Sequence, residues 1–451
     1  MVADAATGGV LRSGRALHPE GTEVDPEAWW VALNSAIADA GGLADVAAIS
    51  ICGQQHGMIV LDHKGRVIRD ALLWNDTRSA AAAAALDLEF LDLVQRTGSR
   101  PVASFTSTKL RWLRDAEPEN VSLIAAIALP HDWLTWRIRG FGPENPRLDE
   151  LTTDRSEASG TGYWNPTSGE YDLEVLTAAI GTSGITLPRV LAPDDSAGHL
   201  DFDPELPNIL VGVGAGDNAG AALGLGAQEG DVIVSIGTSG TVFALAPSPF
   251  CDTTGTVAGF ADASGLFLPL VATLNAARVL DSVAGLLGVD LHTLGQLALQ
   301  AKPGADGLVL KPYFEGERTP NLPNATGTLF GLTLSSTNRT NLARATIEGL
   351  LCGLAGGLDA LRDQGLEPRR ILLIGGAAQN PAIAAIAAQV FQEPVVVPQP
   401  GEYVAIGAAV QAAWALTGTR PAWEVPIFAA PDSDFQPIIR KQYLERRPGT
   451  P

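Results

Sequence analysis

Short apolar runs rich in β-branched residues alternate with longer runs of helical spacing, and this alternation constrains the fold more than any other feature of the sequence. The pattern is typical of an α/β protein. In the first half we expect strands over Val46–Cys52, Ile124–Leu129 and Ile209–Val213, a hairpin from Met58–Asp62 and Val67–Leu73, and helices over Ser79–Arg96 and Ser107–Asp115.

The second half repeats this scheme, so we predict two α/β domains, 1–224 and 225–451, with a functional cleft between them. Its expected elements are a hairpin over Asp231–Ala246, strands at Leu266–Ala272 and Arg370–Ile374, and helices over Asn275–Leu287, Asn341–Arg362, Pro381–Phe391 and Val404–Leu416. The tail after Pro421 is proline-rich and charged, and we expect it to take no part in the core.

Charge and cysteine content narrow the function classes. The chain has 30 Lys and Arg against 50 Asp and Glu, a formal charge of -20, and no basic stripe, which disfavours nucleic acid and anionic membranes as partners. Its three cysteines, Cys52, Cys251 and Cys352, form no CxxC pair, and the chain shows neither a signal peptide nor an apolar run of about 18 residues. We therefore expect a cytoplasmic protein.

A glycine-rich run, NILVGVGAGDNAGAALGLG, holds a single acid, Asp217, and allows three interpretations. Its GxGxxxG spacing is a weak match to a dinucleotide-binding turn, and a carboxylate there would repel a pyrophosphate. Alternatively, Asp217 caps a helix over Asn218–Gly226. A helix N-terminus would also lower the pKa of the carboxyl, which suits a base that accepts a proton from a substrate hydroxyl.

Two further glycine turns are candidates for phosphate and nucleotide contacts. Gly237-Thr238-Ser239-Gly240 lies between two predicted strands, where backbone N–H groups and hydroxyls can cradle phosphate oxygens, although an ordinary hairpin turn has the same composition. LLIGGAAQNP again joins a strand to a helix, for a nucleotide or for close packing. The chain contains no GxxxxGK[ST] loop, no HExxH and no zinc spacing among its six histidines.

Seven motifs in order resemble the FGGY family of carbohydrate kinases, over nearly the whole chain from about Asp25 to about Gly418. They are GQQHG, LLWNDTRS, FTSTKLRWL, GAGDNAG, SIGTSGT, GERTPNLPNATGTLFGL and LIGGAAQNP. The resemblance implies two ribonuclease-H-like domains of the actin-like ATPase type that close over a sugar and MgATP, with ATP and Mg²⁺ as cofactors. The family's frequent dimers lead us to expect a homodimer, and we identify no metal ligand among the residues of this sequence.

The resemblance also implies roles for individual residues. Asp217 matches the catalytic base. Gln55, His56 and Asn218 match positions that hold sugar hydroxyls. Gly237 and Thr238 match the phosphate hairpin, and Gly376 and Asn380 match the adenosine site.

The expected substrate is a neutral ketose, because Gln55 and His56 hydrogen-bond to a polyol and neither carries the fixed positive charge suited to a sugar acid or sugar phosphate. The expected reaction is phosphorylation of D-xylulose by ATP, with ribulose, another ketose or a polyol as the alternative substrate.

The N-terminus departs from the family pattern. FGGY kinases begin with a strand and a DxGT hairpin that holds phosphate, whereas the first residues here resemble the segment after that hairpin, with a turn at Gly8-Gly9. We expect the first strand to be missing, and with it an Asp near the metal, so that the chain as written has weak or no kinase activity. A start placed too far downstream, truncation and a sugar-binding pseudokinase are the three alternatives.

Overall fold

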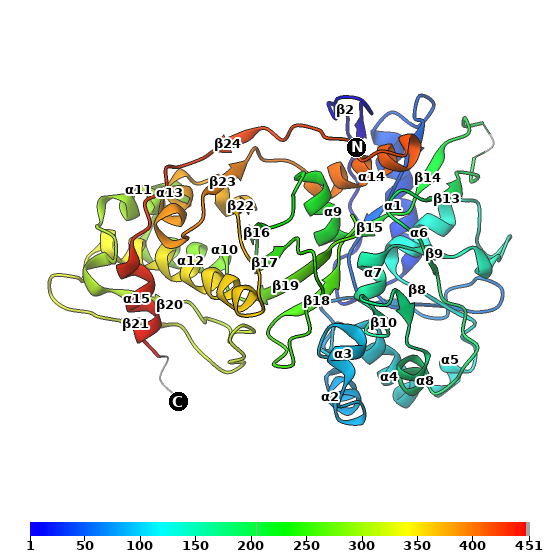
Figure 1. Ribbon diagram of the computed structural model, residues 1–451, viewed down its shortest axis with the longest axis horizontal. Coiled ribbons are helices and arrows are strands. Elements are labelled where there is room, and N and C mark those ends of the chain that lie inside the picture. The colour runs from blue at the N-terminus through cyan, green and yellow to red at the C-terminus, as the bar shows by residue number, and fades with distance from the viewer. Residues whose placement is uncertain (204, 448–451) are drawn as a thin grey trace. The chain divides into compact units, whose positions relative to one another are not determined.

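The computed structural model describes residues 1–203 and 205–447, which form two compact units (Figure 1). Unit 1 comprises residues 1–227, 247–268 and 402–424, and unit 2 comprises residues 228–246, 269–401 and 425–451. The alternation of strands and helices confirms the predicted α/β class. The predicted division into domains 1–224 and 225–451 cuts the chain once and stays a prediction. Each compact unit instead consists of three separate segments of the chain.

Unit 1 is built from small sheets of two or three short strands, together with helices. Its strands are β1 (Val2–Ala3), β2 (Val10–Arg12), β3 (Glu23–Val24), β4 (Ala48–Ile49), β5 (Cys52–Gly53), β6 (Ile59–Leu61), β7 (Ala71–Leu72), β8 (Ala126–Ala128), β9 (Thr152–Thr153), β10 (Trp164–Asn165), β11 (Glu170–Tyr171), β12 (Arg189–Val190), β13 (Ser196–His199), β14 (Leu210–Gly212), β15 (Ala215–Gly216) and β18 (Ala258–Ala261). Its helices are α1 (Pro26–Asp39), α2 (Ala80–Glu89), α3 (Leu93–Thr97), α4 (Thr106–Ala116), α5 (Pro118–Val121), α6 (Pro130–Ile138), α7 (Arg155–Ser159), α8 (Leu173–Ile180), α9 (Asp217–Gly224) and α14 (Tyr403–Thr417).

Unit 2 centres on a sheet in which β19 (Phe267–Thr273), β17 (Gly240–Ala244), β16 (Asp231–Ile236), β22 (Arg370–Ile374), β23 (Val395–Pro398) and β24 (Ile427–Ala429) follow one another. A hairpin of β20 (Val309–Lys311) and β21 (Thr328–Phe330) lies apart from it. The helices are α10 (Ala277–Leu287), α11 (Leu291–Gln300), α12 (Arg339–Asp363), α13 (Pro381–Val390) and α15 (Pro437–Glu445).

Two expectations about helices are wrong. The helix expected over Ser79–Arg96 is broken into α2 and α3, because Phe90 adopts an extended backbone and turns its ring into the core. The tail also contributes to the core of unit 2: α15 buries Ile439 and Tyr443, and Arg440 donates to the carbonyl of Cys352 in α12 at 3.0 Å. The apolar spacing of α15 covers too few residues to stand out beside the prolines that precede it.

Helix α14 returns from far along the sequence to pack on α9 within unit 1 (Figure 1). The two helices approach so closely that a Cβ added at Gly407 would collide with the carbonyl oxygen of Gly220, and one at Gly224 with that of Tyr403. Small residues on both helices permit this approach, since a side chain at either contact would push the backbones apart.

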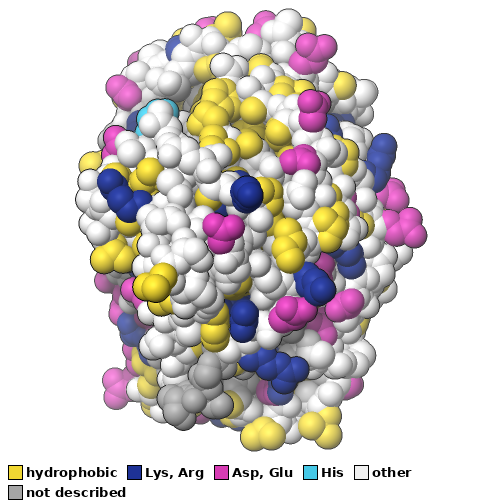
Figure 2. All heavy atoms as spheres, turned by 90° about the vertical axis from the view of Figure 1, so that its left-hand side faces the viewer, with side chains coloured by type: hydrophobic (Ala, Val, Ile, Leu, Met, Phe, Trp, Pro, Cys, Tyr) yellow, Lys and Arg dark blue, Asp and Glu magenta, His cyan; other side chains and the backbone are white. Residues whose placement is uncertain are grey.

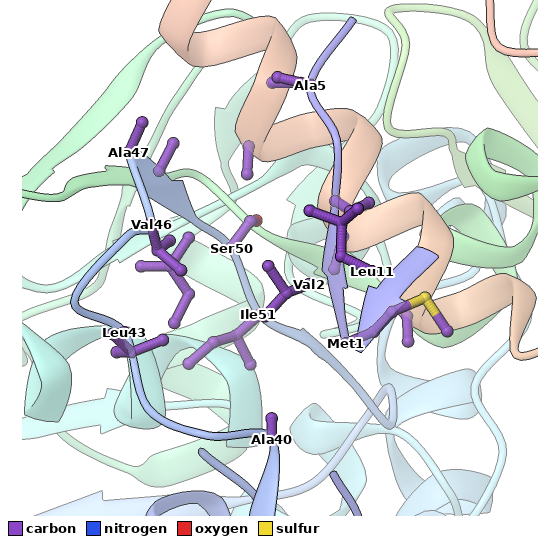
Figure 3. Close-up of a pocket in the computed structure, with 18 of the residues that line it drawn as sticks. Met1, Val2, Ala5, Leu11, Ala40, Leu43, Val46, Ala47, Ser50 and Ile51 are labelled. Carbon is purple, nitrogen blue, oxygen red and sulfur yellow. The ribbon is translucent and has the colours of Figure 1, made fainter. Parts of the chain in front are cut away.

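An apolar groove of about 570 Å³ opens in unit 1 between α1, α14 and the strand edges of β1 and β4 (Figure 3). The labelled side chains of Val2, Leu11, Leu43, Val46 and Ile51 come from these separate segments and gather around the groove (Figure 3). The hairpin of β1 and β2 turns at Gly8, whose φ of 75° is left-handed, as the expected Gly8-Gly9 turn requires. Strand β4 is the last strand of its sheet on this side.

On the face shown in Figure 2, Lys and Arg side chains are scattered among Asp and Glu side chains and do not gather in one patch. Within the described residues, no single helix has the length and apolar character needed to cross a membrane, although the bent pair α10 and α11 meets both criteria by length and composition alone.

Candidate active site

The candidate sugar residues lie at the carboxyl ends of two neighbouring parallel stretches of unit 1. Ala48–Gly53, which contains β4 and β5, runs parallel to Leu210–Gly216, which contains β14 and β15, and Gly53 pairs with Gly216. Gln55 and His56 follow the first stretch and Asp217 follows the second. Because parallel strands end at the same edge, the fold brings these three residues together there, where α/β proteins commonly bind ligands.

Gln55 is fixed by the segment around Ser156, which the sequence analysis did not single out. The Nε2 of Gln55 donates to the carbonyl oxygen of Ser156 at 2.9 Å, and the N–H of Gly216 donates to the Oγ of Ser156 at 2.9 Å. Ser156 Oγ in turn donates to Asp154 at 2.6 Å. Ser156 therefore links the amide of Gln55 to the residue that precedes Asp217.

His56 is held in an uncommon backbone conformation, with a φ of 69°. Its Nδ1 lies 2.6 Å from the carbonyl oxygen of Gly160, so Nδ1 carries the hydrogen. The ring lies against those of Phe105 and Phe260, with centroid distances of 4.9 and 5.6 Å. A polar ring with aromatic neighbours suits a polyol, which offers both hydroxyl and C–H groups.

Lys109 is hydrogen-bonded to the backbone of the His56 turn. Its Nζ donates to the carbonyl oxygen of His56 at 2.8 Å and also to that of Ser104. The side chain is fully buried, and burial lowers the pKa of Lys109 to about 7. Lys109 belongs to the FTSTKLRWL motif, but the sequence of that motif does not indicate that its ammonium group donates to backbone carbonyls.

The predicted helix cap at Asp217 is wrong in detail. Gly216 occupies the cap position, and Asp217 is the first residue of α9. Its Oδ1 accepts from the N–H of Asn218 at 2.7 Å and from the side-chain amide of Asn218 at 2.9 Å. Asn218 thus orients the carboxyl of Asp217, in addition to its predicted contact with sugar hydroxyls.

The expected lowering of the Asp217 pKa is also wrong. Burial raises the pKa of Asp217 to about 6, and the hydrogen bonds from Asn218 oppose this rise only in part. Desolvation wins because the carboxyl lies among the packed elements around Gly216, which the local sequence does not reveal. A carboxyl with this pKa is ionised at neutral pH and is a stronger base than an ordinary aspartate.

The candidate nucleotide residues of unit 2 also follow the carboxyl ends of neighbouring parallel strands. Strands β16 and β22 are parallel neighbours, with Ser235 paired to Ile374. Gly237 and Thr238 follow β16, and Gly376 lies two residues after β22, so both glycine turns lie at one edge of the sheet. Thr238 and Ser239 are exposed between β16 and β17, which leaves their hydroxyls accessible to phosphate oxygens.

A hollow of about 240 Å³ lies beside Gly376 and Asn380. Its walls are largely apolar and include Leu280 of α10, Leu294 of α11 and Ile347 of α12. Asn380 caps α13, accepting from the N–H of Ala382 at 3.0 Å and donating to the carbonyl oxygen of Leu291 at 2.8 Å. These hydrogen bonds fix the amide of Asn380 in the wall of the hollow. The hollow is large enough for a flat ring but not for a whole nucleotide.

Within the described ranges, no three His, Cys, Asp or Glu side chains come together as a metal site.

Comparisons with known proteins identify the family of the chain. Residues 14–224 match the N-terminal domain of the FGGY family of carbohydrate kinases, and residues 232–416 match its C-terminal domain. The chain is 44% identical to a xylulose kinase from Streptomyces rubiginosus over 98% of this chain and 92% of the relative, and 44% identical to one from Streptomyces coelicolor over 93% and 85%.

The fold is similar to that of a crystal structure of xylulose kinase from Bifidobacterium adolescentis, with a TM-score of 0.92 and 47% identity. The match covers 98% of this chain and 96% of that one.

Proposed function

Because the chain belongs to the FGGY family of carbohydrate kinases, we propose that it transfers the γ-phosphoryl group of ATP to D-xylulose, giving D-xylulose 5-phosphate. The observation that carries this proposal is the convergence of Gln55, His56 and Asp217 at one strand edge, in a chain whose relatives are xylulose kinases at 44 to 47% identity. None of the comparisons supports the pseudokinase alternative.

The proposed mechanism assigns Asp217 the role of base. Gln55, His56 and Asn218 hold the sugar hydroxyls, and the ionised carboxyl of Asp217 accepts the proton of the attacking hydroxyl as its oxygen bonds to the γ-phosphorus. The bond from phosphorus to the bridging oxygen breaks, and ADP leaves with that electron pair. Such transfers need mainly positioning and charge neutralisation, so a base of modest strength is sufficient.

The nucleotide part of the proposal rests on unit 2. At the turn of Gly237 and Thr238, the N–H and hydroxyl of Thr238 would hold phosphate oxygens, and the hollow beside Gly376 would take the adenine ring. When bound with ATP, Mg²⁺ would supply positive charge that neutralises the phosphates.

Substrate charge follows from the sugar residues. Gln55 and Asn218 are neutral, and Lys109 beside His56 donates to two backbone carbonyls. This favours a neutral sugar over a sugar acid or a sugar phosphate. A homodimer and a cytoplasmic location stay predictions from the sequence.

A coupled ADP-release assay with MgATP and a panel of D-xylulose, D-ribulose, other ketoses and polyols tests the proposal. We expect the highest kcat/KM with D-xylulose. A higher value with ribulose or a polyol would reassign the substrate. Sugar-induced thermal stabilisation without ADP release in the presence of any sugar, even when the family's N-terminal strand and hairpin are added, would favour the pseudokinase. The same assay tests the expectation of weak activity.

Replacing Lys109 with methionine is expected to raise the KM for the sugar by roughly tenfold, because the carbonyls of His56 and Ser104 each lose a charge-assisted hydrogen bond of about 1.5–3 kcal/mol. Steady-state kinetics at saturating ATP measures this change. Lys64→Met, at an exposed lysine, is the matched control and should leave the KM unchanged. An unchanged KM in Lys109→Met would show that the His56 turn holds without this support.

A further inference from the structure

Glu157 is a buried acid beside the Asp217 turn that no role described so far explains. Its side chain is fully buried, and neither of its carboxyl oxygens has a hydrogen-bond partner among the described residues. A buried polar group without a partner costs about 1–3 kcal/mol. The cost of burying Glu157 beside Asp217 therefore suggests that its carboxyl has a functional or a steric role.

The carboxyl of Glu157 packs against the residue that precedes the base. A Cβ added at Gly216 would lie 2.9 Å from Oε1 of Glu157 and 2.7 Å from Cγ of Gln55, so these two side chains close on the Cα of Gly216. The N–H of the same residue is held by Ser156. Glu157 and its neighbours in α7 therefore enclose Gly216 and limit the directions in which Asp217 can point.

The other oxygen of Glu157 faces His131, which contacts the start of the same turn. Oε2 lies 3.9 Å from Nδ1 of His131, while Nε2 of that ring lies 3.2 Å from the carbonyl oxygen of Val213. The contact with Val213 requires a hydrogen on Nε2, so a neutral ring directs the lone pair of Nδ1 at Glu157 and at Asp132, which is 3.2 Å away. Oxygens and a nitrogen lone pair repel one another unless protons are held among them.

We propose that Glu157 is a positioning residue for Asp217, which as a neutral acid fills the space between Gly216 and His131 and fixes the turn 213–216 without adding a second negative charge. This inference rests on the proposed function, since it takes Asp217 as the base. Burial, together with the charges of Asp154 and Asp217, raises the pKa of Glu157 well above its ordinary value, in agreement with a neutral carboxyl. The ionisable groups around this cluster are His131 and Asp132 of α6, Asp154 before α7, Cys52 of β5, Asp217 of α9, Tyr163 and Tyr171.

Two substitutions test the proposal, each assayed with sugar and MgATP across a range of pH. Glu157→Ala is expected to lower kcat by roughly 10- to 100-fold, because a small misplacement of a reacting group has effects of that size. The KM for ATP should change by less than about twofold, because the groups that bind ATP are untouched. Glu157→Gln, a neutral group of the same shape, should restore kcat to within about threefold of the parent and keep the acid limb of the pH profile in place.

Glu348→Gln is the matched control. Glu348 is a buried glutamate of unit 2 whose pKa burial also raises, and its replacement should leave the acid limb of kcat unmoved. Thermal denaturation shows whether each variant folds. If Glu157→Ala does not fold, Glu157→Gln alone decides the matter through its kcat and its pH profile.

Three results would overturn the inference: parental kcat in Glu157→Ala, an equal loss of kcat in Glu157→Gln and Glu157→Ala, or an acid limb that moves down by about one pH unit in Glu157→Gln, which would reveal a charged Glu157. A parent protein that stays inactive even with the family's N-terminal strand and hairpin added would instead refute the proposed function. An active parent with an inactive Asp217→Asn variant and unaffected Glu157 variants would refute this inference alone.

Discussion

Replacing Asp217 with asparagine is expected to lower kcat by roughly 10²- to 10⁴-fold, the usual contribution of a positioned general base. Asparagine keeps the shape of the side chain and can still accept from the N–H of Asn218, but it cannot take a proton from the sugar. The KM for the sugar should change little, because Gln55, His56 and Asn218 are untouched. Rates of ADP release with saturating sugar and MgATP provide the measurement.

The pH profile of the parent protein belongs to the same prediction. Since the pKa of Asp217 is about 6, kcat/KM for the sugar should fall about tenfold per pH unit below pH 6 and not only below the ordinary aspartate value near 4. Folding stability changes with pH in the opposite direction to the rate. The folded protein binds the proton of Asp217 more tightly than the unfolded chain, so stability decreases as the pH rises from about 4 to 6. Above pH 6, Asp217→Asn should therefore be at least as stable as the parent.

That stability is the internal control, because it separates loss of the base from loss of the fold. Asp149→Asn removes an exposed carboxylate of unit 1 that pairs with Arg147, and it should leave kcat unchanged. Sugar-induced thermal stabilisation of Asp217→Asn should remain close to that of the parent. Turnover by Asp217→Asn within tenfold of the parent would exclude Asp217 as the base.

Replacing Gly407 with alanine is expected to destabilise unit 1 by about 3 kcal/mol or more, at the upper end of overpacking substitutions, because the new methyl group would collide with a backbone carbonyl and not with a movable side chain. Helices α9 and α14 would have to separate to admit it. The midpoint of thermal unfolding should fall by about 6–10 °C. Differential scanning calorimetry measures this shift.

Gly356→Ala is the matched control for Gly407→Ala. Gly356 also lies inside a helix, α12, but a Cβ there would meet nothing within 4 Å. Alanine at this position should raise stability by about 0.5–1 kcal/mol through its better helix propensity. Equal effects of the two substitutions would show that helix propensity, and not the close approach of α9 and α14, determines the response at Gly407.

The positions of Gln55, His56 and Asp217 were predictable because each follows an apolar strand directly and is marked by a glycine turn. Strand ends and turns depend on short stretches of sequence, and parallel neighbours then bring the ends together without further information. The comparisons confirm the family and its two-domain fold on this basis. The roles of the individual site residues stay predictions, which the substitutions above test.

The residues that hold Gln55, His56 and Asp217 in position were not predictable. Glu157, Ser156 and Lys109 act on the site through contacts with residues about 50 to 100 positions away in the sequence, and no local pattern encodes such contacts. The direction of the Asp217 pKa shift was wrong for the same reason, since a helix N-terminus can be recognised from a few residues whereas burial depends on the whole unit.

The return of α14 to unit 1 has a consequence for the order in which the protein matures during synthesis. The Oε1 of Gln411 in α14 lies 3.4 Å from the N–H of Gly214, within the turn that leads to Asp217. Chains grow from the N-terminus, and domains usually fold as soon as they are complete. Here residues 402–424 leave the ribosome only after the main part of unit 2, so unit 2 has most of its sequence available before unit 1 can close around the base. A nascent chain that already carries Asp217 therefore still lacks the helix that holds its turn in place.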